Sequence, residues 1–168
     1  MSSFGSQMRK RLNELRKAGQ NVPKIIHDVA RDATVAAIEV ATKATPPNGG
    51  APIAGTNTRK GNLAEHWTTD SKIEPVNGVT VLANEAKDDR GEQYASYVND
   101  GHRVDKHFVP GLHIVGDHLN YDAGYKGGIV VGTKTTFVPG LYMKEKGIAK
   151  YRTVVRKELD KRVREAFK

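Results

Sequence analysis

Apolar residues near the start of the chain recur at the spacing of an α-helix. Met8, Leu12 and Leu15 are four and three residues apart, which places them on one helical face. The residues around them are mostly Arg and Lys, so the other faces are charged. This pattern predicts an amphipathic helix that ends near Gly19.

A second helix is predicted directly after the first. Asn21 is a suitable N-cap, and Pro23 suits the first helical turn, where its missing N–H would have no partner anyway. The apolar side of this helix is largely alanine, so a partner element can approach closely. We expect that partner to be the sheet of the same chain, with a helix of another subunit as the alternative. The apolar side comprises Ile25, Ile26, Val29, Ala33, Ala37, Val40 and Ala41.

Residues 45–61 (TPPNGGAPIAGTNTRKG) interrupt all periodicity. A composition rich in Pro and Gly buries too little apolar surface to offset the entropy of ordering, so we predict a long loop. A loop of this length is either functional or disordered, and both interpretations stay open. The next stretch predicts a short helical turn that brings Leu63 and Trp67 to the core, because a single Trp in a small domain usually serves packing.

Strands are predicted in the middle of the chain. Two β-branched runs, Ile73–Pro75 and Val79–Asn84, flank Asn77-Gly78, which is a strong signal for a tight β-hairpin. Tyr94–Val98 is rich in aromatic and β-branched residues, so we predict a third strand and an antiparallel meander. Asn99-Asp100-Gly101 then supplies a turn.

Residues 112–136 are predicted to form an inserted β-arm. Its strands are Leu112–Val115 and Ile129–Val131, and the stretch rich in Gly, Asp and Tyr between them forms its tip. The sequence FVPGL occurs on both sides, starting at Phe108 and at Phe137. We expect the two copies to lie side by side at the base of the arm.

These elements predict a single α+β domain over residues 1–168. Helices pack on a small antiparallel β-sheet, and a long Pro/Gly loop and a β-arm project from it. The last helix is predicted over residues 143–167. Its apolar face would comprise Ile148, Tyr151, Val155, Leu159 and Val163.

Composition narrows the class of protein. The chain has 168 residues, enough for one domain with its own core, and a modest hydrophobic share of 38%. Without cysteine it can form neither disulfides nor thiolate metal sites. No apolar run approaches the ~20 residues of a membrane-spanning helix, and the start of the chain lacks the apolar core of a signal peptide. We therefore expect a soluble protein that is made in the cytoplasm.

The net charge of +8 is concentrated at the two ends of the chain. Residues 1–31 hold seven Lys and Arg against two acidic residues, and residues 144–168 hold ten against four. Basic helices can approach DNA without reading its bases, although a charged run is more often a solvated face. The candidate DNA-facing residues are Arg9, Arg16, Arg59, Lys60, Arg156, Lys157 and Arg164.

Signals for catalysis or metal binding are weak. Histidines and aspartates gather between positions 102 and 118, but their spacing matches no compact zinc motif. His66, His102 and Arg103 could form a metal-free acid–base set acting on RNA, although nothing in the sequence brings them together. The chain has no P-loop, GxSxG or HExxH motif. We expect no enzymatic activity, no metal and no cofactor.

Two short motifs stand on either side of the predicted arm. The first is Tyr94-Ala95-x-Tyr97-Val98-x-x-Gly101-His102-Arg103, and the second is Phe-Val-Pro-Gly-Leu-Tyr-Met at residues 137–143, followed by a basic helix. Together with the N-terminal helix, the Pro/Gly loop and Trp67, this order resembles the tail-completion, or head–tail joining, family of long-tailed bacteriophages. That family usually has an acid at the position of Asn99.

The resemblance implies a structural protein of the virion neck, made in the host cytoplasm, that forms a ring around the DNA channel. We expect a hexamer, which contacts adjoining neck and tail-terminator proteins, touches channel DNA non-specifically and binds no membrane. A ring subunit needs two different complementary patches, for which loop 45–61 and arm 112–136 are candidates. The alternatives are a monomeric basic nucleic-acid-binding module and a small ribonuclease. The predicted interface residues are Tyr94, Tyr97, Gly101, His102, Arg103, Phe108, Phe137, Leu141, Tyr142 and Met143.

Overall fold

The computed structural model describes residues 4–46, 62–88, 90–133 and 136–166. It combines helices with small two-stranded antiparallel sheets, which confirms the α+β class predicted from the sequence. Residues 47–61 of the predicted Pro/Gly loop lie outside the described residues, and Arg59 and Lys60 lie there with them. The elements are α1 (Phe4–Ala44), α2 (Asn62–Thr69), β1 (Lys72–Val76), β2 (Val79–Val81), α3 (Ala95–Asp100), β3 (Gly101–Arg103), β4 (His107–Pro110), β5 (Leu112–Val115), β6 (His118–Tyr121), β7 (Gly128–Val131), β8 (Phe137–Pro139) and α4 (Met143–Ala166).

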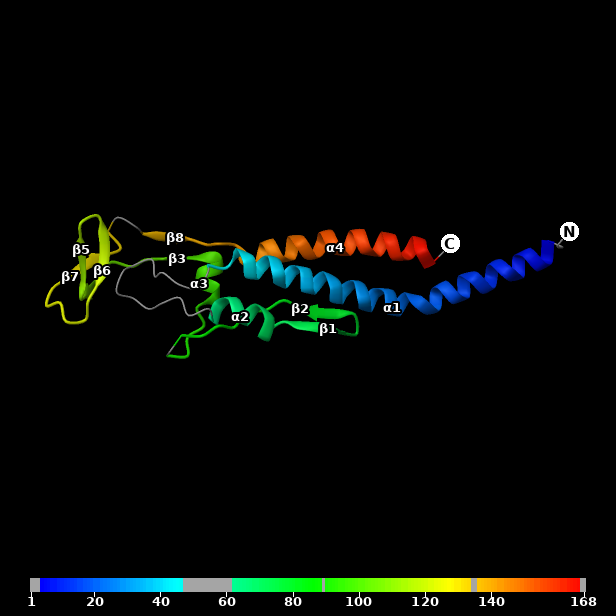
Figure 1. Cartoon of the computed structure of the whole chain (residues 1–168), viewed down its shortest axis with the longest axis horizontal. Helices are drawn as coiled ribbons and strands as arrows, with labels where there is room; N and C mark the ends of the chain where they lie inside the picture. The colour runs from blue at the N-terminus through cyan, green and yellow to red at the C-terminus, as the bar shows by residue number, and fades with distance from the viewer. Residues whose placement is uncertain (1–3, 47–61, 89, 134–135, 167–168) are drawn as a thin grey trace.

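Helix α1 is one continuous element of 41 residues with Pro23 inside it. The prediction of two helices separated near Gly19 is therefore wrong. A proline has no N–H, and its ring presses on the carbonyl of the residue four positions earlier, here Gly19, which can bend a helix without ending it. Figure 1 shows a bend between the dark-blue first part of α1 and the lighter remainder.

The alanine-rich side of α1 packs mainly on α4, which runs antiparallel to it (Figure 1). Ala37 and Ala41 are buried, and a Cβ added to Gly147 of α4 would lie 3.0 Å from the Ala37 carbonyl oxygen. The close approach predicted for this side is thus used within the same chain. Its main partner is nevertheless a helix rather than the sheet, because small side chains let two helix backbones come together.

The inner face of α4 departs from the prediction toward its C-terminal end. Tyr151 and Val155 are half-buried as expected, but Leu159 and Val163 are each 38% exposed. A spacing of four residues drifts around a helix that has 3.6 residues per turn, so the predicted stripe leaves the interface. Arg162 takes the inner position there and binds Asp32 at 2.6 Å and Asp28 at 3.3 Å on α1.

The core is a small cluster where α1, α2 and α4 meet. Ile38, Ala41, Trp67 and Met143 are buried in it, which confirms the predicted packing role of Trp67. The hydroxyl of Thr45 lies beside this cluster. It accepts a hydrogen bond from the Trp67 indole at 2.9 Å, donates to the Ala41 carbonyl at 2.8 Å and lies 3.2 Å from the Met143 sulfur.

The predicted β-hairpin at Asn77-Gly78 is confirmed. Strands β1 and β2 are antiparallel with Val76 opposite Val79, and the φ angles of Asn77 and Gly78 are 52° and 76°. A two-residue hairpin turn of this kind needs such positive values. Strand β2 ends at Val81, earlier than predicted, because the next residues turn toward the core, where Leu82 packs.

The predicted strand Tyr94–Val98 is instead the start of helix α3, and no three-stranded meander forms among the described residues. Ala95 and Asn99 are four residues apart and both are buried, so this segment presents a helical face to the protein. Contacts of this kind override the β-propensity of a short segment. Gly101, with φ 81°, ends the helix, so of the predicted turn Asn99-Asp100-Gly101 only the glycine lies outside α3.

The segment between α3 and α4 is one long, interrupted β-hairpin. Its ladders are nested: β3 pairs with β8, β4 with β7, and β5 with β6 at the tip. The pairing thus spans residues 101–139, so the predicted borders 112–136 are too narrow and the predicted tip contains a strand, β6. Figure 1 shows β5, β6 and β7 at the end of the molecule opposite the N-terminus.

The two FVPGL copies do not lie side by side. Phe108 is opposite Val130 on β7, whereas Phe137 is opposite Arg103 on β3, so the copies belong to different ladders of the hairpin. The two copies share a local requirement for a glycine, because neighbouring backbone comes close to it. In each copy the glycine meets backbone that a Cβ would strike: Asp122 for Gly111, and Asn99 for Gly140.

The bond between Thr45 and Trp67 gives a stability prediction. Thr45→Val leaves the buried indole N–H without an acceptor, so we expect the free energy of unfolding to fall by about 1–3 kcal/mol. Trp67→Phe alone should also destabilise, but the double variant should lose clearly less than the sum of the two single losses, because the second change removes the unpaired donor. Urea denaturation of all four proteins measures the coupling. Additive losses would show that the bond contributes nothing.

Candidate interaction surfaces

The β3–β8 ladder joins the two sequence motifs that the hairpin separates along the chain. Gly101 lies opposite Pro139, His102 opposite Val138, and Arg103 opposite Phe137. Behind this ladder, the Leu141 and Tyr142 N–H groups donate to the carbonyls of Val98 and Asn99, at 3.0 and 2.9 Å. Most of the predicted interface residues in the two motifs therefore share one junction between α3, the hairpin and α4.

The aromatic residues of this junction are mostly exposed. Tyr97, Phe137 and Tyr142 are 56%, 54% and 53% exposed, and the ring of Tyr97 meets that of His102 edge-on with centroids 6.0 Å apart. Arg103 is exposed too. An exposed aromatic group on a rigid junction is typical of a surface that a partner covers.

Other predicted interface residues lie elsewhere or belong to the scaffold. Met143 is fully buried in the core, and Gly101 is the helix end described above. Phe108 is on β4, 57% exposed, and lies outside the junction. Tyr94 is partly buried at the start of α3, and this burial raises the pKa of its hydroxyl.

Asn99 holds the junction together and was missed by the sequence analysis as a site residue. Its side-chain oxygen accepts a hydrogen bond from the Lys144 N–H at 2.9 Å, which caps the first turn of α4. Its amide nitrogen donates to Glu145 at 3.0 Å and to Asp100 at 2.6 Å. The sequence did carry a signal: the family that the two motifs resemble usually has an acid at this position, and a side-chain oxygen can cap a helix.

The tip of the hairpin carries a second exposed apolar group. Ile114 on β5 lies directly opposite Leu119 on β6, and they are 66% and 41% exposed. Val115 beside them is 56% exposed. Beneath the strands, Leu112 is buried and the ring of His113 stacks on Tyr125 at 4.4 Å. The tip is therefore an ordered element that presents apolar side chains to solvent.

The candidate DNA-facing residues within the described chain lie on two helices. Arg9 and Arg16 are on the N-terminal part of α1, and Arg156, Lys157 and Arg164 are on α4; all five are exposed. Arg164 is paired with Asp160 at 3.0 Å. The positions of these residues on the two helices do not identify a ligand.

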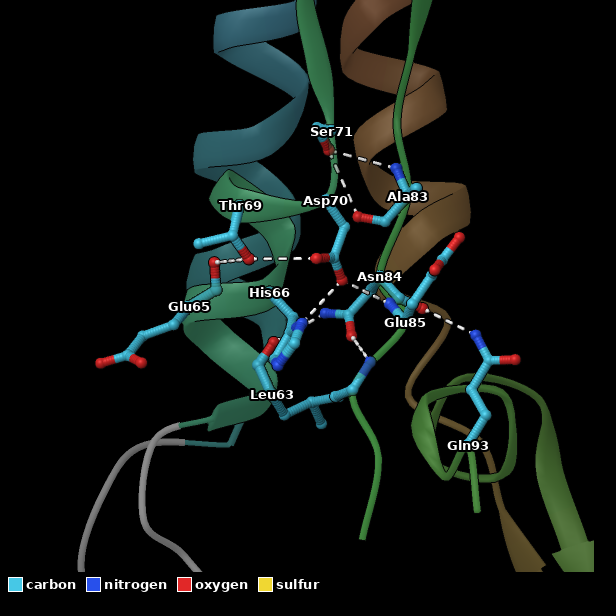
Figure 2. A network of polar contacts seen from close by, with 11 residues as sticks. Leu63, Glu65, His66, Thr69, Asp70, Ser71, Ala83, Asn84, Glu85 and Gln93 are labelled. Carbon is cyan, nitrogen blue, oxygen red and sulfur yellow. Dashed lines mark hydrogen bonds and ion pairs between the residues drawn. The ribbon is translucent and has the colours of Figure 1, made fainter. Parts of the chain in front are cut away.

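A polar network holds α2 against the loop that follows β2 (Figure 2). Asp70 accepts hydrogen bonds from the Glu85 N–H at 2.6 Å and the Thr69 hydroxyl at 3.1 Å, and it lies 2.7 Å from His66 Nδ1. Partial burial raises the pKa of Asp70, but these three partners together outweigh it and hold the pKa below its ordinary value of 3.8. Asn84 adds a bond to the Leu63 carbonyl at 2.7 Å.

The described contacts do not assemble the predicted acid–base set. His66 contacts Asp70 in this network, whereas His102 and Arg103 lie on β3. The arrangement of His66 and Asp70 orients an imidazole, and its visible role is to fix the loop. Within residues 4–46, 62–88, 90–133 and 136–166, no group of three His, Asp or Glu side chains could hold a metal ion.

An open groove of about 370 Å³ lies between α1, the β1–β2 hairpin and α4. Thr34 and Thr80 line it, and their hydroxyls satisfy each other at 2.6 Å. The remaining lining residues are apolar or glycine, apart from Tyr151. The groove offers no charged group that would fix a small ligand.

Comparisons with protein-family models, with curated proteins and with solved structures found no match for this chain. In the described part of the chain, no helix is long and apolar enough to cross a membrane.

The cap made by Asn99 can be tested by introducing a negative charge at this position. Asn99→Asp would retain an acceptor for the Lys144 N–H but would set a carboxylate against Glu145 and Asp100, so we expect a loss of about 1–3 kcal/mol of unfolding free energy at pH 7. Adding Glu145→Gln should restore most of the loss, because the new amide can donate to the new carboxylate. Thermal unfolding of the single and double variants measures this. No recovery in the double variant would contradict the assigned contacts.

The lowered pKa of Asp70 predicts a dependence of stability on pH. A carboxyl group whose pKa is lower in the folded state contributes stability above its unfolded pKa, and that stability is lost as the pH falls through the folded pKa. Asp70→Asn should therefore destabilise by about 1–2 kcal/mol at pH 6 and by less at pH 3. Asp160→Asn, at an exposed ion pair, is the matched control and should change little at either pH. An equal loss at both pH values for Asp70→Asn would refute the electrostatic role.

Proposed function

We propose that this chain is a structural subunit of the neck of a long-tailed bacteriophage, where it completes the tail and joins it to the DNA-filled head. The observation that carries the proposal is the joining of the two family-like motifs by the β3–β8 ladder into one exposed aromatic junction. The resemblance of the two motifs suggests the phage family, and the β3–β8 pairing places both motifs on one surface.

The distribution of apolar surface supports an assembling subunit. Among the described residues, the buried apolar side chains are mostly alanine, while many larger ones are exposed. The molecule is elongated, with exposed apolar groups at the hairpin tip and at the junction, which lie apart along its length (Figure 1). Two different patches on one subunit are what a ring needs, because each contact in a ring joins unlike surfaces.

In this proposal the hairpin tip of each subunit contacts the junction of its neighbour in the ring. The subunit acts by protein–protein contact, without catalysis or cofactor, and we expect a hexamer. The loop 45–61 stays a candidate for further contacts.

Substitutions at the hairpin tip test ring assembly. We expect the purified protein, followed by light scattering after size exclusion across concentration, to form a discrete ring-sized species. Ile114→Thr with Leu119→Thr should leave a folded protein that stays monomeric, because it removes the exposed cross-strand apolar pair from the interface.

The β1–β2 hairpin offers a matched control. Val76 and Val79 also form a cross-strand pair and are 70% and 64% exposed, at least as much as the tip pair, so Val76→Thr with Val79→Thr should assemble like the unchanged protein. Rings that form normally with the substituted tip would refute the role of the tip. A protein that is monomeric at every concentration, and that binds short DNA duplexes tightly with a steep salt dependence, would favour the nucleic-acid-binding module instead.

A further inference from the structure

The N-terminal part of α1 carries a stripe of partly exposed apolar side chains. In Figure 1 this part runs past the end of α4 and past the β1–β2 hairpin. The apolar side chains follow one another at intervals of three, four or seven residues, with Gly19 in the single gap, so they lie on one helical face. The stripe comprises Met8, Leu12, Leu15, Val22 and Ile26, which are 52%, 51%, 44%, 41% and 45% exposed.

The stripe continues a face of α1 that is covered farther along. The same spacing leads from Ile26 to Val29 and Ala33, which are 3% and 0% exposed where α1 packs on α4 and the β1–β2 hairpin. An element that covered the exposed stripe would thus lie end to end with these partners. The partly exposed stretch from Met8 to Ile26 is about 27 Å long at the rise of an α-helix. Beside it Ala18 is only 2% exposed, and at its end Ile26 borders Gly78 of the β1–β2 turn.

The charged residues of α1 beside its apolar face are acidic where α4 packs on it and basic along the exposed stripe. In the covered part, Asp28 and Asp32 of α1 receive Arg162 of α4. Beside the exposed stripe the charges are basic, with Arg9 and Arg16 along one edge and Arg11 along the other. Glu14 is the one acidic residue described between positions 4 and 27, and it is paired with Arg11 at 3.1 Å.

This charge pattern favours one kind of binding partner for the stripe over the others. A second copy of the same helix would set Arg9 and Arg16 against arginines, their own copies in an antiparallel pair and Arg11 in a parallel one, which is unfavourable. DNA would satisfy the arginines but leave the apolar residues uncovered. A helix that lies in a membrane surface usually presents a broad apolar face with aromatic residues, whereas this stripe is narrow and aliphatic, as in a seam between two helices.

We infer that residues 8–26 of α1 are a docking surface for an amphipathic helix of another protein, one with Asp and Glu on both sides of its own apolar stripe. Apolar packing would supply the contact area, and the acidic edges would meet Arg9, Arg11 and Arg16. The surface lies at the opposite end of the molecule from the hairpin tip. This inference and the ring proposal therefore fail or stand separately.

Designed peptides can test the surface on the full-length protein. The probe is a helical peptide of about four heptads, with Leu and Ile on its apolar stripe and Glu at both flanking positions. The control peptide is identical except for Lys at the flanking positions. We expect the Glu peptide to bind at least about tenfold more tightly than the Lys peptide at low salt, measured by fluorescence anisotropy.

Matched variants locate the binding. Leu12→Gln with Leu15→Gln should abolish it, and Arg9→Gln with Arg16→Gln should weaken it several-fold. Lys10→Gln with Lys17→Gln removes the same charge from outside the edges of the stripe and should weaken it less. Circular dichroism confirms that each variant keeps its helix content.

Four outcomes would overturn the inference. Equal binding of the two peptides, or binding that Leu12→Gln with Leu15→Gln leaves unchanged, would show that the stripe is not the site. Self-association of the unchanged protein that this double variant removes would identify a second copy as the occupant. Binding to phosphatidylcholine/phosphatidylserine vesicles that the same variant removes would identify a membrane surface. Duplex DNA that competes with the Glu peptide and loses affinity with Arg9→Gln and Arg16→Gln would identify a nucleic acid.

Discussion

The fold depends on one small buried cluster in which three helices meet. Trp67 fills the space between α1 and α4, and its indole N–H is satisfied by Thr45, a residue directly after α1. Met143, the first residue of α4, closes the same cluster. Because the end of one long helix and the start of another are fixed at this point, both helices extend from it in one direction and the β-hairpin in the other (Figure 1).

The sequence predicts well those elements that local chemistry decides. Asn77-Gly78 specifies a turn that few other residue pairs allow, and the hairpin formed as expected. The alanine stripe of α1 indicates close packing, although it does not indicate which element packs there. By contrast, Gly19 and Pro23 signal the end of a helix that in fact continues, because a bend satisfies both residues. Local signals of this strength are overruled when the rest of the element is strongly helical.

The candidate surfaces were predictable only in part. The two short motifs marked the junction, but their direct pairing across the interposed hairpin is a tertiary fact that spacing alone does not contain. The sequence predicts only a turn at Asn99, and its role as the cap of α4 depends on a residue 45 positions away that the fold brings back to it. The basic edges of α1 were visible in the sequence. That its apolar stripe stays partly exposed follows only from the structure.

The nested hairpin has a mechanical consequence. Both of its strands leave the body at the same junction, and its hydrogen bonds run across the strands. A pull on the tip along the hairpin is then shared by two covalent backbones in parallel, and the ladders are neither unzipped nor sheared. The tension passes to the end of α3 and the first turn of α4, where Asn99 links the two. The element is thus suited to pass a load from its tip to this anchorage.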